Sequence, residues 1–154
     1  MFLGYYPSKI AGLIEILTSA NQVIALNFVH SKKKNLPKII PDILKSCIKQ
    51  LDEYFLGKRQ TFNLDLYLDG TEFQKKVWEQ LMKIPYGSTC AYQDIARKIR
   101  HAQASRAVGT ANGCNHIPII IPCHRVIASN GGLGGYTPGL SIKRNLLMHE
   151  EKFK

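Results

Sequence analysis

Residues 92–111 read YQDIARKIRHAQASRAVGTA, and this stretch decides the fold of the C-terminal half of the chain. The spacing of its apolar residues predicts two short helices, over about 92–99 and about 103–111. A turn near Arg100-His101 separates them. Two short helices joined by a tight turn resemble a helix-turn-helix unit, the arrangement with which many proteins bind DNA.

The second of these helices has an unusual composition. Seven of the ten residues from 102 to 111 are small, and Arg106 is the one long charged side chain among them. Helices that read base edges in the major groove carry long polar side chains instead. The small residues are therefore compatible with tight helix–helix packing or with a backbone that approaches another surface closely.

Regular elements are also predicted on both sides of this unit. Thr71 and Gln74 have the spacing of a capping box at the start of a helix, and Pro85-Tyr86-Gly87 ends that helix. The last helix is expected over 142–150. Towards the N-terminus the pattern predicts a hairpin of strands over 10–17 and 23–29, a break at Pro37 and Pro41, a helix from Asp42 to Gly57, and an alternating strand over 62–68.

Composition and charge narrow the possible functions. The 154 residues include 21 Lys and Arg against 11 Asp and Glu, a formal charge of +10 that favours polyanionic partners but also serves solubility. No apolar run is long enough to span a bilayer, and the first ten residues lack the order of a secretory signal. We expect no membrane association and a cytoplasmic location, or a nuclear one in a eukaryote.

Four cysteines stand at positions 47, 90, 114 and 123 without a C-x-x-C pair, which argues against disulfides and against a thiolate zinc site. Cys123 follows the apolar segment IPIIIP of residues 117–122, in which 119–121 is expected to form a buried strand or extended segment. Pro122 then ends ladder hydrogen bonding. A cysteine held at the end of a rigid element can serve as an accurately placed nucleophile, or simply as a packing residue.

Neighbouring residues favour Cys123 as a nucleophile over Cys123 as a packing residue, but they leave both alternatives open. A thiol must become a thiolate to attack, and the adjacent His124 is the usual kind of activator. Glu150 could orient that histidine, as carboxylates do in catalytic triads. Further along, four of the five residues 131–135 are glycines, which suits a flexible lid or the wall of a pocket.

At this point several motifs resemble one known family, the O6-alkylguanine-DNA alkyltransferases or methylated-DNA–protein-cysteine methyltransferases. The matching residues are Pro122-Cys123-His124-Arg125-Val126, Arg106-Ala107-Val108-Gly109, Asn115, the glycine-rich loop ending in Tyr136, and residues 146–150. The resemblance is close over about 71–151. It is looser over 1–66, where mainly residues 51–57 look familiar.

The resemblance implies an α+β fold of two lobes. Residues 1–68 would form an α/β supporting lobe with a small ribonuclease H-like sheet. Residues 69–154 would form a mainly helical alkyltransferase and DNA-binding domain with a helix-turn-helix or winged-helix-like unit. The implied activity is direct DNA repair, in which the alkyl group of O6-alkylguanine, and less efficiently of O4-alkylthymine, moves irreversibly to the protein's own cysteine. No cofactor is implied.

Roles follow for individual residues of this sequence. Cys123 would accept the alkyl group, His124 would act as its base through a water molecule, and Glu150 and Asn115 would hold that network. Double-stranded DNA would be bound through the minor groove by a monomer, with Arg106 replacing the base that is flipped out. The remaining DNA contacts would come from Tyr92, Ala107, Gly109 and Arg125, and the alkylguanine pocket would be lined by Tyr92, Val126, Tyr136 and Thr137.

The sequence departs from the family pattern in three respects. His116 stands where proline commonly follows the asparagine, which loosens the turn that carries Asn115. Cys114 replaces a common glycine and adds a thiol near the site. Some members hold zinc in the first lobe, but residues 1–46 contain no cysteine and only one histidine, His30, so we predict no metal.

Three other functions compete with alkyl transfer. A non-catalytic module that binds alkylated guanine would lack the cysteine. A helix-turn-helix regulator would bind duplex DNA whether or not it is alkylated, and would leave residues 122–125 unexplained. A Cys-His hydrolase would need an oxyanion hole and would turn over repeatedly.

Overall fold

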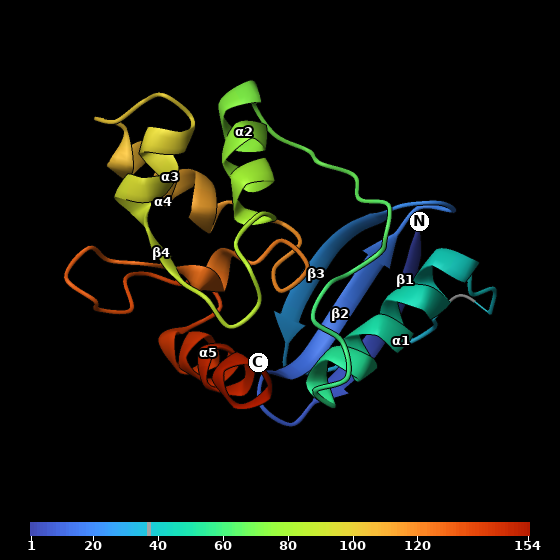
Figure 1. Ribbon diagram of the computed structural model, residues 1–154. Coiled ribbons are helices and arrows are strands. Elements are labelled where there is room, and N and C mark those ends of the chain that lie inside the picture. The colour runs from blue at the N-terminus through green and yellow to red at the C-terminus, as the bar shows by residue number, and fades with distance from the viewer. Residues whose placement is uncertain (37) are drawn as a thin grey trace. The chain divides into compact units, whose positions relative to one another are not determined.

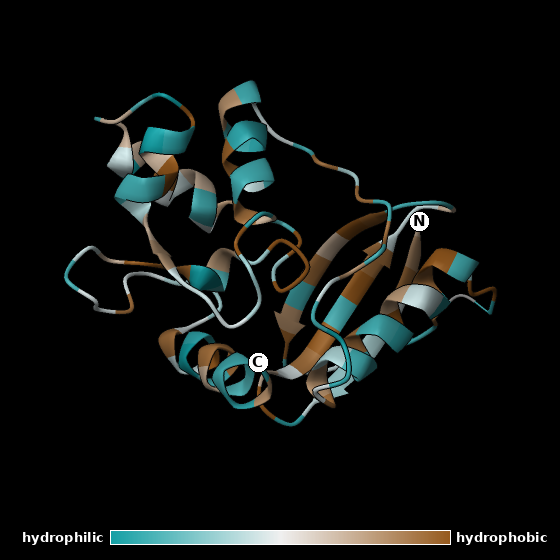
Figure 2. Ribbon diagram, in the orientation of Figure 1, coloured by the Kyte–Doolittle hydropathy of each residue, from teal (hydrophilic) through white to brown (hydrophobic). Residues whose placement is uncertain are grey.

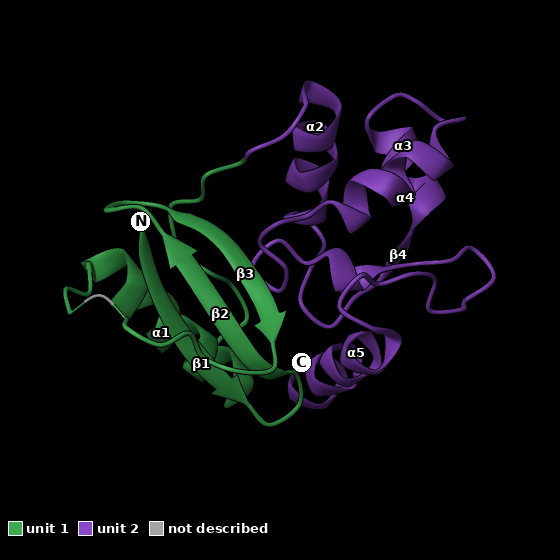
Figure 3. Ribbon diagram, turned by 180° about the vertical axis from the view of Figure 1, so that it is seen from behind, with its two compact units in different colours: residues 1–68 green, residues 69–154 purple. Residues whose placement is uncertain are grey.

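The computed structural model describes residues 1–36 and 38–154, and the chain divides into two compact units, Met1–Leu68 and Asp69–Lys154. Figure 3 shows the two units in different colours. The N-terminal unit combines one sheet with one helix, and the C-terminal unit is mainly helical. The fold class is therefore α+β, as the sequence predicted.

The N-terminal unit is built on a three-stranded antiparallel sheet. Its strands are β1 (Phe2–Ser8), β2 (Gly12–Thr18) and β3 (Val23–Val29), in that order. The predicted hairpin is confirmed as β2 and β3, whereas β1 was not predicted. The sequence of β1 carries Gly4 and Pro7 and has no clear alternation, so its strand structure depends on pairing with β2.

Helix α1 (Asp42–Phe55) covers one face of this sheet (Figures 1 and 2). A side chain at Gly4 would approach a methyl carbon of Leu44 to 2.8 Å, so glycine allows the helix to lie close to β1. Gly57 follows the helix with φ of 74°, as expected of a C-terminal glycine. The face of α1 that is turned to the sheet buries Leu44, Cys47, Leu51 and Tyr54.

The predicted strand over 62–68 is only partly correct. Side chains alternate between half-buried and exposed there, but the segment pairs with β3 at a single bridge, between Val23 and Leu66. The hydrogen bonds of this bridge run from Val23 N to Asp65 O (2.9 Å) and from Tyr67 N to Val23 O (2.8 Å). Of the two prolines predicted to mark a break, Pro41 is the N-cap of α1, and Pro37 lies outside the described residues.

The C-terminal unit contains three helices that precede Cys123 in the chain. These are α2 (Glu72–Leu81), α3 (Tyr92–Lys98) and α4 (Ser105–Gly113), and the last two form the predicted helix-turn-helix (Figure 1). Trp78 of α2 is buried, and its Nε1 donates to the carbonyl of Ala111 in α4 at 2.9 Å. The unit is completed by β4 (Cys90–Ala91), the 3-10 turn η1 (Cys123–Arg125), β5 (Val126–Ile127), which pairs in parallel with β4, and α5 (Leu140–Phe153).

The segment before Cys123 is buried but is not a strand. It folds back on itself, with the amide of Ile121 donating to the carbonyl of Ile117 at 2.9 Å. Ile119 has φ of 73°, a conformation that β-branched residues rarely adopt. Ile119, Ile120 and Ile121 are all buried, and the burial of their side chains stabilises this strained turn. The sequence did not reveal the turn, because a run of apolar residues occurs in buried turns as well as in buried strands.

None of the helices described over 1–36 and 38–154 has the length and apolar character needed to cross a membrane.

The capping box at the start of α2 gives a first testable prediction. Thr71 Oγ1 accepts from Gln74 N at 3.1 Å, and Gln74 Oε1 accepts from Thr71 N at 2.9 Å. Replacing Thr71 with alanine removes one of these bonds and should lower the free energy of unfolding by about 1 kcal/mol. Urea denaturation measures this loss. Thr71→Ser keeps the hydroxyl and should change stability much less, and equal losses in both variants would contradict the capping explanation.

Candidate active site

Cys123 begins η1, the single 3-10 turn that follows the buried isoleucines. The amide of Arg125 donates to the carbonyl of Pro122 at 3.0 Å, which closes this turn. Only 4% of the Cys123 residue surface is exposed. The nucleophile predicted from the sequence is therefore held on a short, rigid turn inside the C-terminal unit.

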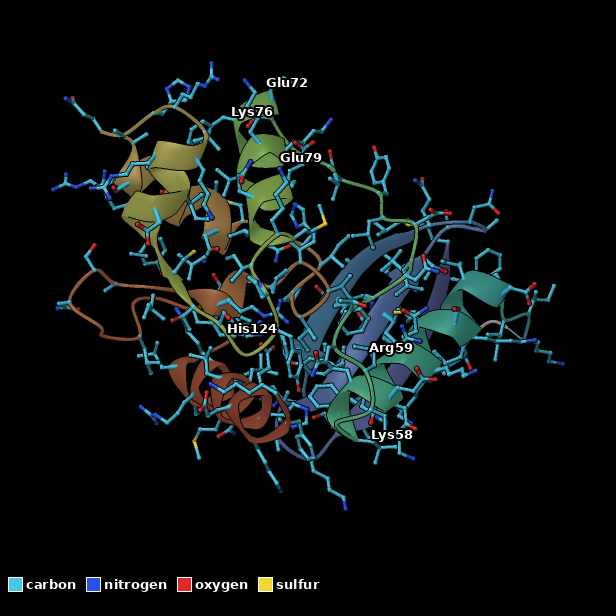
Figure 4. The ribbon with its side chains drawn as sticks, viewed as in Figure 1. Lys58, Arg59, Glu72, Lys76, Glu79 and His124 are labelled. Atoms are coloured by element: carbon cyan, nitrogen blue, oxygen red, sulfur yellow. The ribbon has the colours of Figure 1, made fainter. Side chains whose placement is uncertain are left out.

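His124 and Arg125 converge on one carboxylate of α5. His124 Nε2 lies 2.5 Å from Glu150 Oε2 (Figure 4 shows where His124 lies). Arg125 donates through Nε to Glu150 Oε1 at 2.7 Å and through Nη2 to Oε2 at 3.2 Å. The amide of Gly87 adds a further donor to Oε1 at 3.1 Å. The carboxylate is 1% exposed and is thus satisfied by the protein alone.

These contacts set the charge states of the cluster. Burial alone would favour a protonated Glu150, but the hydrogen bonds and charges of His124 and Arg125 hold its pKa well below the usual range. Burial lowers the pKa of His124, against the opposing effect of Glu150. Near neutral pH the histidine is then a neutral imidazole that can accept a proton, beside a carboxylate that can stabilise the resulting imidazolium.

The thiol of Cys123 starts from the protonated state. Burial raises its pKa to about 11, although the Asn115 side chain and the charge of Lys143 act in the opposite direction. A buried thiol beside a neutral imidazole can react as a nucleophile only if its proton is removed during the reaction. These residue types are the ones that could supply a nucleophile, a base and an orienting carboxylate.

Asn115 holds the turn that leads to Cys123. Its Oδ1 accepts from the amide of Ile117 at 2.9 Å, and its Nδ2 donates to the carbonyl of Ile121 at 2.8 Å. The ring of His116 lies 6.2 Å from that of Trp78, in an edge-to-face arrangement. The substitution of proline by His116 therefore leaves Asn115 fixed by two hydrogen bonds.

Lys143 is a site residue that the sequence did not reveal. It is fully buried in α5, and its Nζ donates to the carbonyls of Val126 (2.6 Å), Gly135 (3.1 Å) and Leu133. Burial lowers its pKa to about 8. The bonds to Leu133 and Gly135 hold the glycine-rich loop, and the bond to Val126 ties α5 to β5. Lys143 could have been identified from the sequence only by its helical spacing, which places it on the same face of the last helix as Leu146 and Glu150.

The residues expected to contact DNA lie on α3 and α4. Arg106 and Ala107 are exposed, and Gly109 is half-buried beside the ring of Tyr92. Tyr92 is itself half-buried, and its hydroxyl lies 3.5 Å from the carbonyl of Gly135. The exposed side chains of Arg97, Lys98 and Arg100 add positive charge to the same helix-turn-helix.

Residues expected to line the pocket sit around the glycine-rich loop. Val126 is buried in β5, and burial raises the pKa of Tyr136, with Cys123 nearby contributing in the same direction. Thr137 Oγ1 donates to the carbonyl of Gly113, at the end of α4, at 3.1 Å. Arg125 does not fit its expected role in DNA contact, because its guanidinium is buried against Glu150 and the carbonyl of Ile84.

Comparison with known proteins gives matches over both units. A family model described as the DNA-binding domain of 6-O-methylguanine DNA methyltransferase matches residues 72–152, and the ribonuclease-like domain of the same family matches 1–68. A methylated-DNA–protein-cysteine methyltransferase of Methanosarcina acetivorans is 47% identical over 157 residues, which is 97% of this chain and 98% of the relative. A methylated-DNA–protein-cysteine methyltransferase of Mycobacterium bovis is 41% identical over 145 residues, which is 94% of this chain and 86% of the relative.

Solved structures agree with these matches. The crystal structure of Mycobacterium tuberculosis OGT in complex with DNA superposes with a TM-score of 0.89 at 37% identity, covering 99% of this chain and 94% of that one. An O6-methylguanine DNA methyltransferase from Methanococcus jannaschii gives a TM-score of 0.69 at 28% identity, covering 98% and 92%.

The buried carboxylate gives the second prediction. Glu150→Gln leaves the guanidinium of Arg125 without its counter-charge and should cost about 3–5 kcal/mol of unfolding free energy at neutral pH. Because the folded pKa of Glu150 is depressed, its contribution is complete above the unfolded carboxyl pKa of about 4.3 and is lost as pH falls through the folded value. The difference between the two proteins should therefore shrink in acid.

Urea denaturation at several pH values checks this prediction. The exposed neighbour Glu151, which pairs with Lys154 at 2.8 Å, offers a matched control. Glu151→Gln should change stability by less than about 1 kcal/mol. A Glu150→Gln variant as stable as the parent at neutral pH would show that the cluster is not a structural requirement.

Proposed function

We infer the roles of single residues from one premise: the chain belongs to the 6-O-methylguanine DNA methyltransferase family. It repairs alkylated DNA by direct reversal, moving the alkyl group from the damaged base to one of its own cysteines. The observation that carries the assignment of that cysteine is the buried contact of His124 with Glu150, directly beside Cys123.

We assign Cys123 as the acceptor. Its sulfur attacks the carbon bound to guanine O6, the new S–C bond forms as the C–O6 bond breaks, and the electron pair leaves with the guanine oxygen. The product is a thioether, which is a poor leaving group near neutral pH. No second nucleophile is assigned to this reaction, so each molecule acts once.

His124 is the base that accepts the thiol proton through a water molecule. Its pKa lies below the ordinary histidine value, so it is neutral and available near pH 7. Glu150 accepts from Nε2 and stabilises the imidazolium that forms. Acidification through the folded pKa of His124 protonates the base in advance and therefore lowers the rate of transfer.

DNA is bound through the helix-turn-helix. A relative that matches almost the whole chain was crystallised with DNA. We propose that α4 enters the minor groove, since its small residues allow close approach and minor-groove readout demands little sequence specificity. Exposed Arg106 then fills the space of the flipped base, Tyr92 presses on the flanking phosphate, and one monomer suffices for the reaction.

Intact mass spectrometry tests the identity of the acceptor. After incubation with duplex DNA carrying O6-methylguanine, the protein should gain the mass of one methyl group, located by peptide mapping on Cys123. Cys123→Ala should gain nothing, and Cys114→Ser, which changes an exposed thiol nearby, should react normally. A protein that gains no mass in excess substrate would overturn the assignment, as would methylation at another cysteine.

Arg106 gives a separate prediction about base flipping. Arg106→Ala should slow repair in duplex DNA by about 10- to 100-fold, because the unstacking cost is no longer offset, and should leave transfer from free O6-benzylguanine nearly unchanged. Single-turnover kinetics on both substrates measure the effect. Arg97→Ala, which removes an exposed charge from α3, should only weaken salt-dependent binding. Equal losses of Arg106→Ala on the two substrates would contradict a flipping role.

A further inference from the structure

One polar side chain of α4 reaches the reactive segment from inside the C-terminal unit. Asn112, in the last turn of α4, is only 4% exposed. Its Nδ2 donates to the carbonyl oxygen of Cys123 at 3.3 Å. That carbonyl belongs to the peptide that joins Cys123 to His124, so the end of α4 contacts the backbone between the nucleophile and its base.

Each of the two residues that meet at this peptide, Asn112 and His124, carries a buried acceptor atom. Within residues 1–36 and 38–154, neither Asn112 Oδ1 nor His124 Nδ1 has a hydrogen-bond partner. The Glu150 carboxylate occupies Nε2 of His124, which assigns the ring proton to Nε2 and leaves Nδ1 with a lone pair. Both atoms therefore need a donor, and buried polar groups that lack a protein partner commonly bind an ordered water.

Under the proposed function, a water molecule carries the thiol proton of Cys123 to His124 Nδ1. We propose that Asn112 Oδ1 binds this water and holds it in place, so that Asn112 is a positioning residue for alkyl transfer. The inference rests on the proposed function of Cys123. A water molecule has two protons for these two acceptors, and its oxygen remains free to accept the thiol proton. The two water protons thus pair with the two protein acceptors, and the thiol proton pairs with the water oxygen.

The proton and electron balance of the step is complete. As the S–C bond forms and the C–O6 bond breaks, the thiol proton passes to the water oxygen, and one water proton passes to His124 Nδ1. The water is regenerated, and the imidazolium lies against the carboxylate of Glu150. Asn112 gains and loses no proton. It fixes the direction from which the water receives the proton.

An asparagine suits this task better than its closest substitutes. The bond from Nδ2 to the Cys123 carbonyl fixes the amide plane and so aims Oδ1. Aspartate would offer the acceptor but would lose that donor and add a buried charge, and leucine would fill a similar volume with neither group. The same residue connects the helix proposed to bind DNA with the proton path.

Other ionisable groups surround the Cys123–His124 pair and must be kept constant in a test. They come from α5, η1, the glycine-rich loop and α3, and they are Glu150, Lys143, Arg125, Tyr136 and Tyr92. A substitution at Asn112 alters none of them directly. Any change in the pH dependence of transfer between the parent and an Asn112 variant therefore reports on the path through the water.

The experiment compares Asn112→Leu with the parent in single-turnover transfer from free O6-benzylguanine across pH, which avoids any effect on DNA binding. Near neutral pH the variant should react about 10- to 100-fold more slowly, because general base catalysis through the water is lost. The deficit should shrink as the pH approaches the pKa of the thiol, since the thiolate then forms without the relay. A deficit that is constant across pH, or no deficit, would overturn the proposal.

Two controls separate this result from other causes. Trp78→Phe removes a different buried hydrogen bond to the last turns of α4 and keeps both proposed water ligands, so its pH–rate profile should keep the shape of the parent's. If Asn112→Leu does not fold, Asn112→Ala replaces it in the same comparison. A parent that transfers no alkyl group to Cys123 refutes the proposed function. A parent that reacts while the variant keeps the parental profile refutes the role of Asn112 alone.

Discussion

The carboxylate of Glu150 is the interaction on which the site depends. It accepts hydrogen bonds from His124, from two nitrogens of Arg125 and from the amide of Gly87, in a position that is almost free of solvent. These donors come from η1 and from the segment after α2, while the carboxylate comes from α5. One charge thus joins three parts of the C-terminal unit that are distant in sequence. Removing it would leave a guanidinium buried without a counter-charge.

This arrangement is consistent with the role proposed for Cys123, a buried cysteine with a raised pKa that acts as a nucleophile. A permanently ionised thiolate at this depth would carry a large desolvation cost, and burial accordingly keeps Cys123 protonated. The neutral imidazole of His124 can take the proton when the substrate is present, because Glu150 is already ionised beside it. The reactive state is therefore formed during the reaction, and the resting thiol is protected from other electrophiles and oxidants by burial.

The sequence allowed the elements with strong local signals to be predicted. The capping box at Thr71, the hairpin of β2 and β3, and the helix-turn-helix all depend on residues close together in the chain. Strand β1 and the single bridge at Leu66 were not predicted correctly. β1 has no clear alternation of its own, although its partner β2 follows it directly in the chain, and the bridge depends on pairing with the distant Val23. The turn at Ile119 was predicted to be a strand or an extended segment, because its residues are apolar in order to be buried and their pattern carries no periodicity that would reveal a turn.

The candidate site shows the same division between local and distant information. Cys123 and His124 are adjacent, and Glu150 in the last helix was the carboxylate expected to orient the histidine, so these three could be named in advance. Lys143 could not, because its partners are backbone carbonyls, which leave no trace in the side-chain sequence.

Helix α4 has to satisfy two requirements at once. Its exposed residues are small around Arg106, which suits close approach to DNA, while its last turn inserts Asn112 beside the Cys123 carbonyl. Immediately after the helix, Asn115 fixes the turn that carries the reactive cysteine. A displacement of α4 on DNA would therefore be transmitted to the backbone of Cys123 through two amide side chains. Substitutions within 106–115 should for this reason rarely affect DNA binding or alkyl transfer separately, with Arg106, whose side chain points to solvent, as the exception.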